Sequence, residues 1–292
     1  MLRWARACWL GSVAAVCSTS SLAAQADEPR VTVDGRTYTP RSIVERNMGS
    51  EEDQTTPFPP HRVIGNVYYV GTRTLSSFLI VTPAGHILLN TTYERNVEGI
   101  RRSVESLGFR FGDVRLVLGN HAHGDHMEGD ALAQQLTGAQ VVVMEADRAM
   151  LEGIRPGDEP HPIDRTVTDE EEVELGGTVL TARLTAGHTP GCTAWTTTVQ
   201  HGGRSYDVVF FCSLRAPARL TPETISQLER SFALVRQLPC DVPLGDHPAQ
   251  YRMQEKYDRL TGGNELAFVE PTGCTTEAEI QEAMFRALLP AR

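Results

Sequence analysis

The six consecutive residues His121-Ala122-His123-Gly124-Asp125-His126 place four potential metal ligands in one short stretch. His121 and His123 are spaced i, i+2, so their side chains project the same way only from an extended or loop backbone, where they can hold one cation between them. Asp125 and His126 point the other way and can begin a second site beside the first. Imidazole and carboxylate ligands suit zinc, and two adjacent zinc ions can activate one water molecule. A loop that is His-rich by chance is the alternative, and four ligand-type residues in register disfavour it.

Two further histidines lie in short loops that follow predicted strands, as the opening motif does. The segment Val114–Leu118 reads as a buried strand directly before that motif. His188 follows a predicted strand at 180–185 in Gly187-His188-Thr189-Pro190-Gly191, and His247 stands in Gly245-Asp246-His247-Pro248. Loops at strand ends commonly converge on a functional site, so we expect both histidines to join the motif. The other four histidines, which we assign to the surface or to helix ends, are His61, His86, His161 and His201.

The first 26 residues have the pattern of a secretory signal peptide. Arg3 and Arg6 precede a mostly apolar segment at 7–16, and Ala24-Gln25-Ala26 offers an A-x-A cleavage site. A lipoprotein would use Cys17, but Val16 is bulkier than the small residue expected before a lipidated cysteine. No other stretch of the sequence approaches the ~20 apolar residues that a spanning helix needs. We therefore expect export to a bacterial periplasm and no membrane attachment after cleavage.

The charge of the chain restricts its partners. The full chain has a formal net charge of −10, and an acidic surface disfavours nucleic-acid backbones and anionic lipid headgroups. The charge does not restrict a small substrate, because bound metals would dominate the field at the site. We expect a monomer that acts on a small molecule.

Four of the six cysteines would remain after cleavage of the signal peptide, and an even number in an oxidising compartment suggests two disulfides. Three pairings are possible. We favour Cys192–Cys212, which would link two neighbouring strands, and Cys240–Cys274, which would tie the last helix to the core. Zinc ligation by these cysteines is the rival interpretation, but none of them stands in a C-x-x-C spacing.

The distribution of periodic segments predicts one domain with an N-terminal arm. Residues 27–60 are rich in Pro, Thr and acidic residues and read as extended, so we divide the mature chain into an arm at 27–56 and a hydrolase domain at 57–292. Apolar alternation and turn residues predict strands at 63–70, 76–82, 86–89, 139–144, 166–185, 193–199 and 206–211. Helical spacing and capping residues predict helices at 96–107, 129–136, 145–154, 221–237 and 276–289. This rhythm favours an α/β fold with two β-sheets packed face to face and helices outside, although other α/β layouts are compatible with it.

The motif and the two later histidines resemble the metallo-β-lactamase superfamily, whose signature is H-x-H-x-D-H followed by two further histidines. The resemblance runs from about Pro57 to the C-terminus and is strongest to subclass B3. Its marks are Gly65-Asn66-Val67-Tyr68-Tyr69-Val70-Gly71, the opening motif, Gly187-His188-Thr189-Pro190-Gly191 with Trp195, and Cys212-Ser213 at a strand end. The resemblance implies a four-layer αββα sandwich, and the cysteine pairings that we favour look like those of this subclass.

The resemblance also implies a metal centre with two Zn²⁺ ions per chain. By this likeness His121, His123 and His188 hold the first zinc, and Asp125, His126 and His247 hold the second. The implied reaction is hydrolysis of a β-lactam ring by a metal-activated hydroxide, which confers antibiotic resistance. Asp125 would also orient the nucleophile, and Ser213 would contact the substrate carboxylate. A strand-end serine that binds only backbone is the alternative for Ser213.

The end of one predicted strand distinguishes β-lactam hydrolysis from other activities of the superfamily. Glyoxalase II-like thioesterases and acyl-homoserine lactonases carry an additional Asp that bridges both metals, at the end of a strand in the second half. Here the corresponding strand at 208–211 ends in Cys212-Ser213 without a carboxylate, which favours the lactamase reading, as does the signal peptide. A dizinc hydrolase of another exported ester, lactone or amide is the alternative function. Two departures from the family pattern, Asn90-Thr91-Thr92 for Asp-Thr-Gly and a short segment at 214–220, lie beside the expected metals and pocket.

Overall fold

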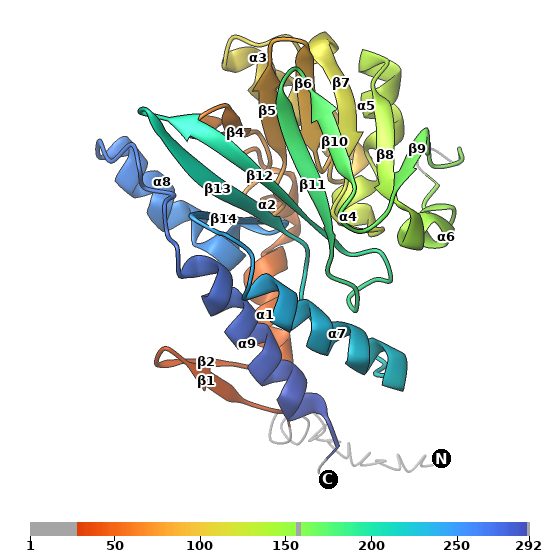
Figure 1. The fold of residues 1–292 in the computed structure, drawn as a ribbon, viewed down its shortest axis with the longest axis vertical. Coiled ribbons are helices and arrows are strands. Elements are labelled where there is room, and N and C mark those ends of the chain that lie inside the picture. Colours follow the sequence, from red (N-terminus) through yellow and green to blue (C-terminus); the bar gives the residue numbers. More distant parts are fainter. Residues whose placement is uncertain (1–27, 156–158, 291–292) are drawn as a thin grey trace, which may run out of the picture.

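The structure, a computed structural model, describes residues 28–155 and 159–290, and two β-sheets dominate it (Figure 1). In spatial order, the first sheet contains β3 (His61–Ile64), β4 (Val67–Tyr69), β5 (Phe78–Thr82), β6 (Gly85–Leu89), β7 (Val114–Leu118), β8 (Gln140–Met144) and β9 (Arg165–Val167). The second contains β10 (Glu172–Leu175), β11 (Thr178–Leu184), β12 (Thr193–His201), β13 (Arg204–Phe211) and β14 (Val242–Gly245). The predicted signal peptide at 1–26 lies outside the described residues.

A separate hairpin and the helices complete the described chain. The hairpin pairs β1 (Val31–Val33) with β2 (Arg36–Tyr38). The helices are α1 (Pro40–Met48), α2 (Glu51–Thr55), α3 (Val97–Ser106), α4 (Gly124–Met127), α5 (Asp130–Thr137), α6 (Arg148–Leu151), α7 (Pro222–Val235), α8 (Met253–Thr261) and α9 (Gly273–Leu288).

Alternating side chains give the molecule four layers. Along β13, Tyr206, Val208 and Phe210 point into the apolar core between the sheets, whereas Val209 and Phe211 face the opposite side. Successive side chains of a β-strand point to opposite faces, so β13 contributes to the core between the sheets and to the packing on its outer face. Helices α7 and α9 pack on the outer face of the second sheet, and α3 and α5 pack on the outer face of the first. The order helix, sheet, sheet, helix confirms the predicted αββα sandwich (Figure 1).

The strand directions bring several loops to one edge of the sandwich. β13 and β14 run parallel, and β11 and β13 are both antiparallel to β12, so β11, β13 and β14 end at the same edge. In the other sheet β6, β7 and β8 run parallel. The candidate ligands follow β7, β11 and β14, and the segment Cys212-Ser213 follows β13. A rigid sandwich therefore carries these residues on its loops, where binding groups commonly lie.

Several predicted elements are confirmed, but one predicted strand is wrong. The strand at 114–118 has the predicted bounds, and the predicted helices at 96–107 and 221–237 contain α3 and α7. The single strand predicted at 63–70 is a hairpin, because the chain reverses at Gly65-Asn66 and pairs β3 with β4. Gly65 has a φ of +52°, and a Cβ there would lie 2.9 Å from the Gln200 carbonyl oxygen, so the turn requires glycine.

The extended conformation predicted for residues 27–60 is also wrong. This segment contains the β1–β2 hairpin and the helices α1 and α2. Each helix begins with a capping box, in which Thr39 accepts a hydrogen bond from the Ser42 N–H and Ser50 accepts one from the Asp53 N–H. Because the third helical residue is Ser or Asp, both boxes escape the usual S/T-x-x-E/Q pattern.

The last helix begins earlier than predicted. α9 starts at Gly273, so Thr276, where the predicted helix at 276–289 begins, lies within the helix. The Thr276 hydroxyl donates to the Thr272 carbonyl at 3.0 Å and does not cap the helix. A Cβ at position 273 would overlap the Pro243 side chain, so glycine allows the first turn of α9 to approach β14.

The N-terminal segment packs against the C-terminal helix. Ile43 of α1 is buried with Ile280 and Met284 of α9. The Arg46 guanidinium pairs with Glu277 of α9 at 2.9 Å, and Figure 1 shows the two helices alongside each other. The arm is thus held on the sandwich by side chains, while its boundary at residue 56 stays a prediction.

Candidate metal centre

The opening motif lies where β7 ends and α4 begins. His121 is 2% exposed and follows the strand in a loop, and the extended backbone of His123 (φ −122°, ψ 149°) caps α4. Asp125 and His126 lie in the first turn of that helix. This change from loop to helix divides the four residues into two pairs, which belong to two different groups of potential ligands.

His188 and His247 reach the motif from two other strand ends. The Nδ1 atom of His188 lies 3.0 Å from the carbonyl oxygen of Arg215, and that of His247 lies 3.0 Å from the carbonyl oxygen of Thr74. A backbone carbonyl can only accept, so each Nδ1 carries the proton. Each Nε2 is then left with a free lone pair.

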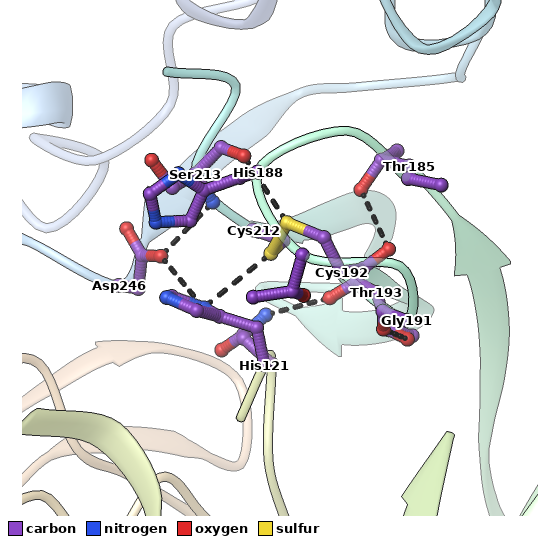
Figure 2. Close-up of a disulfide and its surroundings, with 12 residues drawn as sticks. His121, Thr185, His188, Gly191, Cys192, Thr193, Cys212, Ser213 and Asp246 are labelled. Atoms are coloured by element: carbon purple, nitrogen blue, oxygen red, sulfur yellow. Dashed lines mark hydrogen bonds and ion pairs between the residues drawn. A yellow bond between two sulfur atoms is a disulfide. The ribbon is translucent and has the colours of Figure 1, made fainter. Parts of the chain in front are cut away.

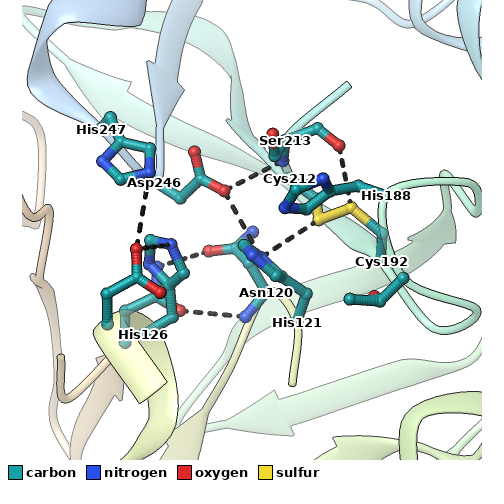
Figure 3. A network of polar contacts seen from close by, with 12 residues as sticks. Asn120, His121, His126, His188, Cys192, Cys212, Ser213, Asp246 and His247 are labelled. Carbon is teal, nitrogen blue, oxygen red and sulfur yellow. Dashed lines mark hydrogen bonds and ion pairs between the residues drawn. A yellow bond between two sulfur atoms is a disulfide. The ribbon is translucent and has the colours of Figure 1, made fainter. Parts of the chain in front are cut away.

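The six predicted ligands form two groups, and within each group one ligand atom per residue lies within 4.8 Å of the others. The groups are His121, His123 and His188, and Asp125, His126 and His247. Ring centroids in the first group are 4.7, 4.8 and 4.9 Å apart. The rings of His121 and His126, with centroids 4.4 Å apart, join the two groups, as Figure 3 shows. The structure therefore brings together all six residues that the sequence singles out.

The buried ring nitrogens of this cluster are suited to a metal. Nε2 of His121 and Nδ1 of His126 have no hydrogen-bond partner among the described residues, and Nε2 of His126 faces only the Asp125 carboxylate. Burial, and then repulsion from neighbouring histidines, holds the pKa of His121 well below its ordinary 6.5, and burial is the main cause that lowers the pKa of His188 to about 3. Neutral imidazoles with a free lone pair are the form that binds metals. Groups of three N and O donors, each with room for a further ligand, suit Zn²⁺.

Asp125 and His126 form a close pair within the second group. Their Oδ2 and Nε2 atoms are 3.2 Å apart. Burial alone would raise the pKa of the Asp125 carboxyl, but His126 and then His247 outweigh burial and hold that pKa well below 3.8. At His126, burial alone would lower the pKa of the ring, but the Asp125 carboxylate outweighs burial, so this pKa is raised overall. Asp125 is therefore an ionised carboxylate at neutral pH, as a metal ligand must be.

Asp147, which the sequence does not single out, ties the opening motif to the loop that carries His188. One carboxylate oxygen accepts from the Ala122 N–H at 2.9 Å and from the Thr189 hydroxyl at 2.8 Å. The other accepts from the Gly191 N–H at 2.6 Å. A Cβ at position 191 would lie 2.6 Å from the Asp147 nitrogen, so this contact requires glycine. No local pattern distinguishes Asp147 from other acidic residues near strand ends.

Asp246 is a second residue that sequence reasoning missed, and it lies behind the candidate ligands (Figure 3). It is fully buried, and its Oδ2 accepts from the Ser213 N–H at 2.9 Å and lies 3.5 Å from Nδ1 of His121. One Asp246 oxygen and one ring nitrogen each of His121 and His126 lie within 4.8 Å of one another. Oδ1 finds no hydrogen-bond partner within 28–155 and 159–290. Its sequence signal is its position directly before His247.

Ser213 and Asn90 lie beside the candidate ligands. Ser213 lines the cavity at the ligands, and its Oγ accepts from the Arg215 N–H at 3.3 Å. Asn90 accepts from the Asn120 N–H at 2.9 Å and donates its side-chain amide to the Asn120 Oδ1 at 2.7 Å. Asn90 therefore fixes the residue directly before His121, at the end of β7.

A cavity of about 220 Å³ opens at the ligands. Its lining consists of Val44, Asn47, Met48, Tyr93, His121, His123, Asp125, His126, His188, Ser213, Arg215 and His247. The first three of these residues belong to α1, so the N-terminal arm forms one wall of the cavity. The sequence does not predict this wall, because it depends on contacts between segments far apart in the chain.

Both favoured cysteine pairs are joined in the structure. The Cα atoms of Cys192 and Cys212 are 5.7 Å apart, and those of Cys240 and Cys274 are 6.5 Å apart. Cys212 lies beside the candidate ligands, with its Sγ 3.5 Å from Nδ1 of His121 (Figure 2). A cysteine needs a free thiolate to bind zinc, so the paired sulfurs disfavour the rival interpretation of these residues as ligands.

The assignment of His61, His86 and His161 to the surface or to helix ends is wrong. Each of the three is 7% exposed. Nε2 of His161 lies 3.2 Å from Oδ2 of Asp130 and 3.0 Å from the Met127 carbonyl oxygen, so this histidine supports α4 from behind. These rings are buried by neighbours that are distant in the sequence, which local polarity does not predict.

Comparison with solved structures identifies the class of fold and then the family. The structure matches the metallo-β-lactamase FEZ-1 from Legionella gormanii with a TM-score of 0.76 and 38% identity, covering 80% of this chain and 95% of that one. It matches BJP-1 of Bradyrhizobium japonicum, described as a subclass B3 metallo-β-lactamase, with a TM-score of 0.74 and 35% identity over 80% and 95% of the two chains. The chain belongs to the metallo-β-lactamase superfamily and is a metallo-hydrolase of that superfamily.

A curated relative comes from another branch of this superfamily. The hydroxyacylglutathione hydrolase of Methylococcus capsulatus is 29% identical over 146 residues, which are 49% of this chain and 50% of that protein. The match thus spans about half the length of that relative. No protein-family profile matches the chain.

Proposed function

We propose that this protein is a dizinc β-lactamase that hydrolyses the β-lactam ring of antibiotics. The observation that carries the proposal is the convergence of two three-residue ligand groups on one cavity. The support for the β-lactam ring as substrate is the 38% identity to FEZ-1 over 95% of that chain. The end of β13 adds to it, because Cys212 is in a disulfide and Ser213 follows, so no carboxylate is available there to bridge two metals.

The proposal assigns the first zinc to His121, His123 and His188 and the second to Asp125, His126 and His247. When bound, two zinc ions supply a water molecule with a pKa near neutrality and positive charge for the oxygen and nitrogen of the reacting amide. Asp125 is suited to orient that water, because it is a carboxylate at neutral pH and lines the cavity. Ser213 is assigned to the substrate carboxylate, through the hydroxyl that lies at the cavity wall.

Tyr93 is a further hydrogen-bond donor in the cavity. Burial, and then the Asp125 carboxylate, raises the pKa of the Tyr93 hydroxyl above its ordinary 10, so this group keeps its proton at neutral pH. A protonated phenol in the cavity can donate to a carbonyl or carboxylate oxygen of the substrate. Its role is therefore to orient the substrate.

A substrate panel tests the proposal. The purified zinc-loaded protein is assayed with a penicillin, a cephalosporin, a carbapenem, a thioester and a lactone, each with and without a chelator. We expect β-lactam turnover that the chelator abolishes and that added zinc restores. Zinc-dependent thioester or lactone cleavage without β-lactam turnover would refute the β-lactamase assignment and leave the metal centre in place.

The second candidate function is hydrolysis of another ester, lactone or amide by the same metal centre. The observation that favours it is the 29% identity to a hydroxyacylglutathione hydrolase over half of that protein. The same panel separates the two candidates, because the substrate with the highest kcat/KM identifies the reaction.

We also propose that the protein is exported to the periplasm by the segment at 1–26. Two cysteine pairs support an oxidising compartment. No helix in the described part of the chain is long and apolar enough to cross a membrane. Fractionation of cells that express the full chain tests this assignment, and we expect the activity and the shortened chain in the periplasmic fraction.

A further inference from the structure

A second, larger hollow lies next to the metal centre, between α1 and α9. This groove has a volume of about 530 Å³. Its apolar lining is Pro40, Ile43, Val44, Ala216, Met284 and Leu288. Val44 and Leu288 are 39% and 38% exposed, which places them among the few large apolar side chains that the described surface leaves open. A concave apolar patch on a water-exposed surface usually marks a binding site.

The groove adjoins the cavity at the candidate ligands. Val44 and Arg215 line both hollows, so they form the boundary between them. The cavity at the ligands holds about 220 Å³, whereas small-molecule sites commonly hold about 300–1,000 Å³. A substrate of drug-like size that reaches the metal centre therefore extends beyond the cavity, and this boundary is one side on which it can do so. The groove offers apolar contacts on the far side of it.

Arg215 gives the boundary a positive charge. Its carbonyl oxygen accepts from His188, so its backbone has a fixed position relative to the ligands. Among the described residues its guanidinium forms no ion pair, whereas Arg46, also on this side of the molecule, pairs with Glu277. A half-buried guanidinium without a carboxylate partner is suited to bind an anionic group, because such hydrogen bonds are charge-assisted. The boundary thus carries a cation, and the groove beyond it combines its apolar lining with the polar side chains of Glu28, Arg41, Glu45 and Gln281.

We propose that the α1–α9 groove is a substrate subsite that holds a bulky apolar side chain, while Arg215 binds a carboxylate of the same molecule. The proposal rests on the proposed hydrolysis at the metal centre. It specifies the substrate class further, as an anionic β-lactam with an aromatic or long alkyl acyl group. A bare ring without an acyl group gains nothing from the groove.

Two matched substitutions test the apolar part of the proposal. Leu288→Gln places an amide in the groove, and Leu136→Gln makes the same change on α5, at a leucine that is 40% exposed and does not line the groove. Each variant is assayed with a penicillin that carries a phenylacetyl group and with the same bicyclic nucleus that lacks any acyl group. We expect Leu288→Gln to lower kcat/KM about fivefold for the acylated substrate alone, mainly through KM. Leu136→Gln leaves both values unchanged.

Arg215→Gln and Arg215→Lys test the cationic part. Both substrates carry the ring carboxylate, so Arg215→Gln raises KM for both by about tenfold, and Arg215→Lys restores part of the loss. Equal kcat/KM for the two substrates in the parent protein, together with no selective effect of Leu288→Gln, would overturn the subsite while β-lactam turnover stands.

The failure of the proposed function has a different signature. If the parent protein hydrolyses neither β-lactam but cleaves acylated lactones, the same variants are compared on a short-chain and a long-chain lactone. A selective loss for the long chain supports the groove, and no selective loss overturns it. Size-exclusion chromatography of the parent and of Leu288→Gln tests whether a second copy of the chain occupies the groove instead. If the parent is a dimer, the variant is a monomer and the acyl preference is unchanged, the groove is a dimer interface and the subsite is overturned.

Discussion

At the level of single residues, Asp246 is a buried carboxylate with one backbone N–H as its hydrogen-bond donor. A buried charge is costly unless it is compensated, and under the proposed zinc assignment the positive charge of metals bound next to His121 would supply the compensation. We predict that Asp246→Asn weakens zinc binding about 10–100-fold, as loss of a carboxylate behind a metal-bound histidine does. The metal-free variant should be at least as stable as the parent, because the uncompensated charge is removed. Chelator competition and thermal unfolding with and without zinc measure both effects.

The matched control for this prediction is Asp147→Asn. Asp147 is also buried, but it accepts hydrogen bonds from three donors. Its substitution should destabilise the metal-free protein by about 1–3 kcal/mol, because charge-assisted bonds are lost. If metal-free Asp246→Asn is destabilised in the same way and keeps the zinc affinity of the parent, Asp246 has a structural role only.

His121 is the second residue whose substitution should reduce zinc binding. Its ring lies 4.4–4.9 Å, centroid to centroid, from those of His123, His126 and His188, so it stands at the junction of both ligand groups. We predict that His121→Ala binds less than two equivalents of zinc and has no turnover above background. Elemental analysis and the substrate panel provide the measurements. His201→Ala, outside the cavity, should keep both properties, and full activity of His121→Ala would contradict the ligand assignment.

The sequence reveals some of these residues and hides others for physical reasons. His121, His123, Asp125 and His126 are contiguous, so their chemistry is visible in one short window. Asp147 contacts residues that lie 25 to 44 positions away in the chain, and Asp246 contacts one that lies 33 positions away. No single-window pattern distinguishes such a carboxylate from a solvated one.

At the level of secondary structure, elements with a buried apolar face were predictable, whereas a helix marked mainly by its capping residues was not. The strand β7 and the helix α3 were predictable because apolar periodicity marks their buried faces. Helix α1 buries two residues, Ile43 and Asn47, so its periodic signal is weak, and the Thr39–Ser42 capping box defines its start instead. Its position over the cavity depends on α9, which is more than 220 residues away.

The anchoring of α1 leads to a prediction about local stability. Ile43 is 1% exposed and packs on Ile280 and Met284, so Ile43→Ala should cost about 2–4 kcal/mol in the free energy with which α1 is held on α9. Hydrogen exchange at residues 40–48 should accelerate, while exchange in β7 stays at the parent rate. Val44→Ala is the neighbouring control, because Val44 is 39% exposed. Uniform acceleration across the sandwich would show that α1 does not open as a separate unit.

At the level of the whole molecule, the four-layer order was predictable in two steps. The rhythm of strands and helices favoured two face-to-face sheets with helices outside, because that order is set by which faces are apolar, and the resemblance to the superfamily distinguished it from other α/β layouts. The groove and the cavity wall were not predictable. They arise where α1, α9 and the segment after β13 meet, and their composition depends on three separate parts of the chain. The residues to which we assign substrate choice are therefore the least visible in the sequence, while the candidate metal ligands are the most visible.

The histidines as a set make the stability of the metal-free protein depend on pH. Burial is the largest cause that lowers the pKa of six of them, namely His61, His86, His121, His123, His188 and His247. The pKa is raised for His126 and His161, mainly by Asp125 and Asp130 against the effect of burial. A raised pKa adds stability that is complete below about 6.5, so these two groups contribute no slope in more acidic solution. Below about pH 6.5 the six histidines with a lowered pKa therefore determine whether stability rises or falls with pH.

We predict that the metal-free protein loses stability as the pH falls from 6.5 towards 4. In this window the unfolded chain binds protons at histidines that the folded protein keeps neutral, so each such group lowers the free energy of unfolding by up to about 1.4 kcal/mol per pH unit. For His188 the window extends down to its folded pKa of about 3. Urea unfolding of chelator-treated protein at pH 6.5, 5.5 and 4.5 measures the slope. His188→Gln should flatten it, and equal stability of the parent at pH 6.5 and 4.5 would contradict the burial of neutral imidazoles at the metal centre.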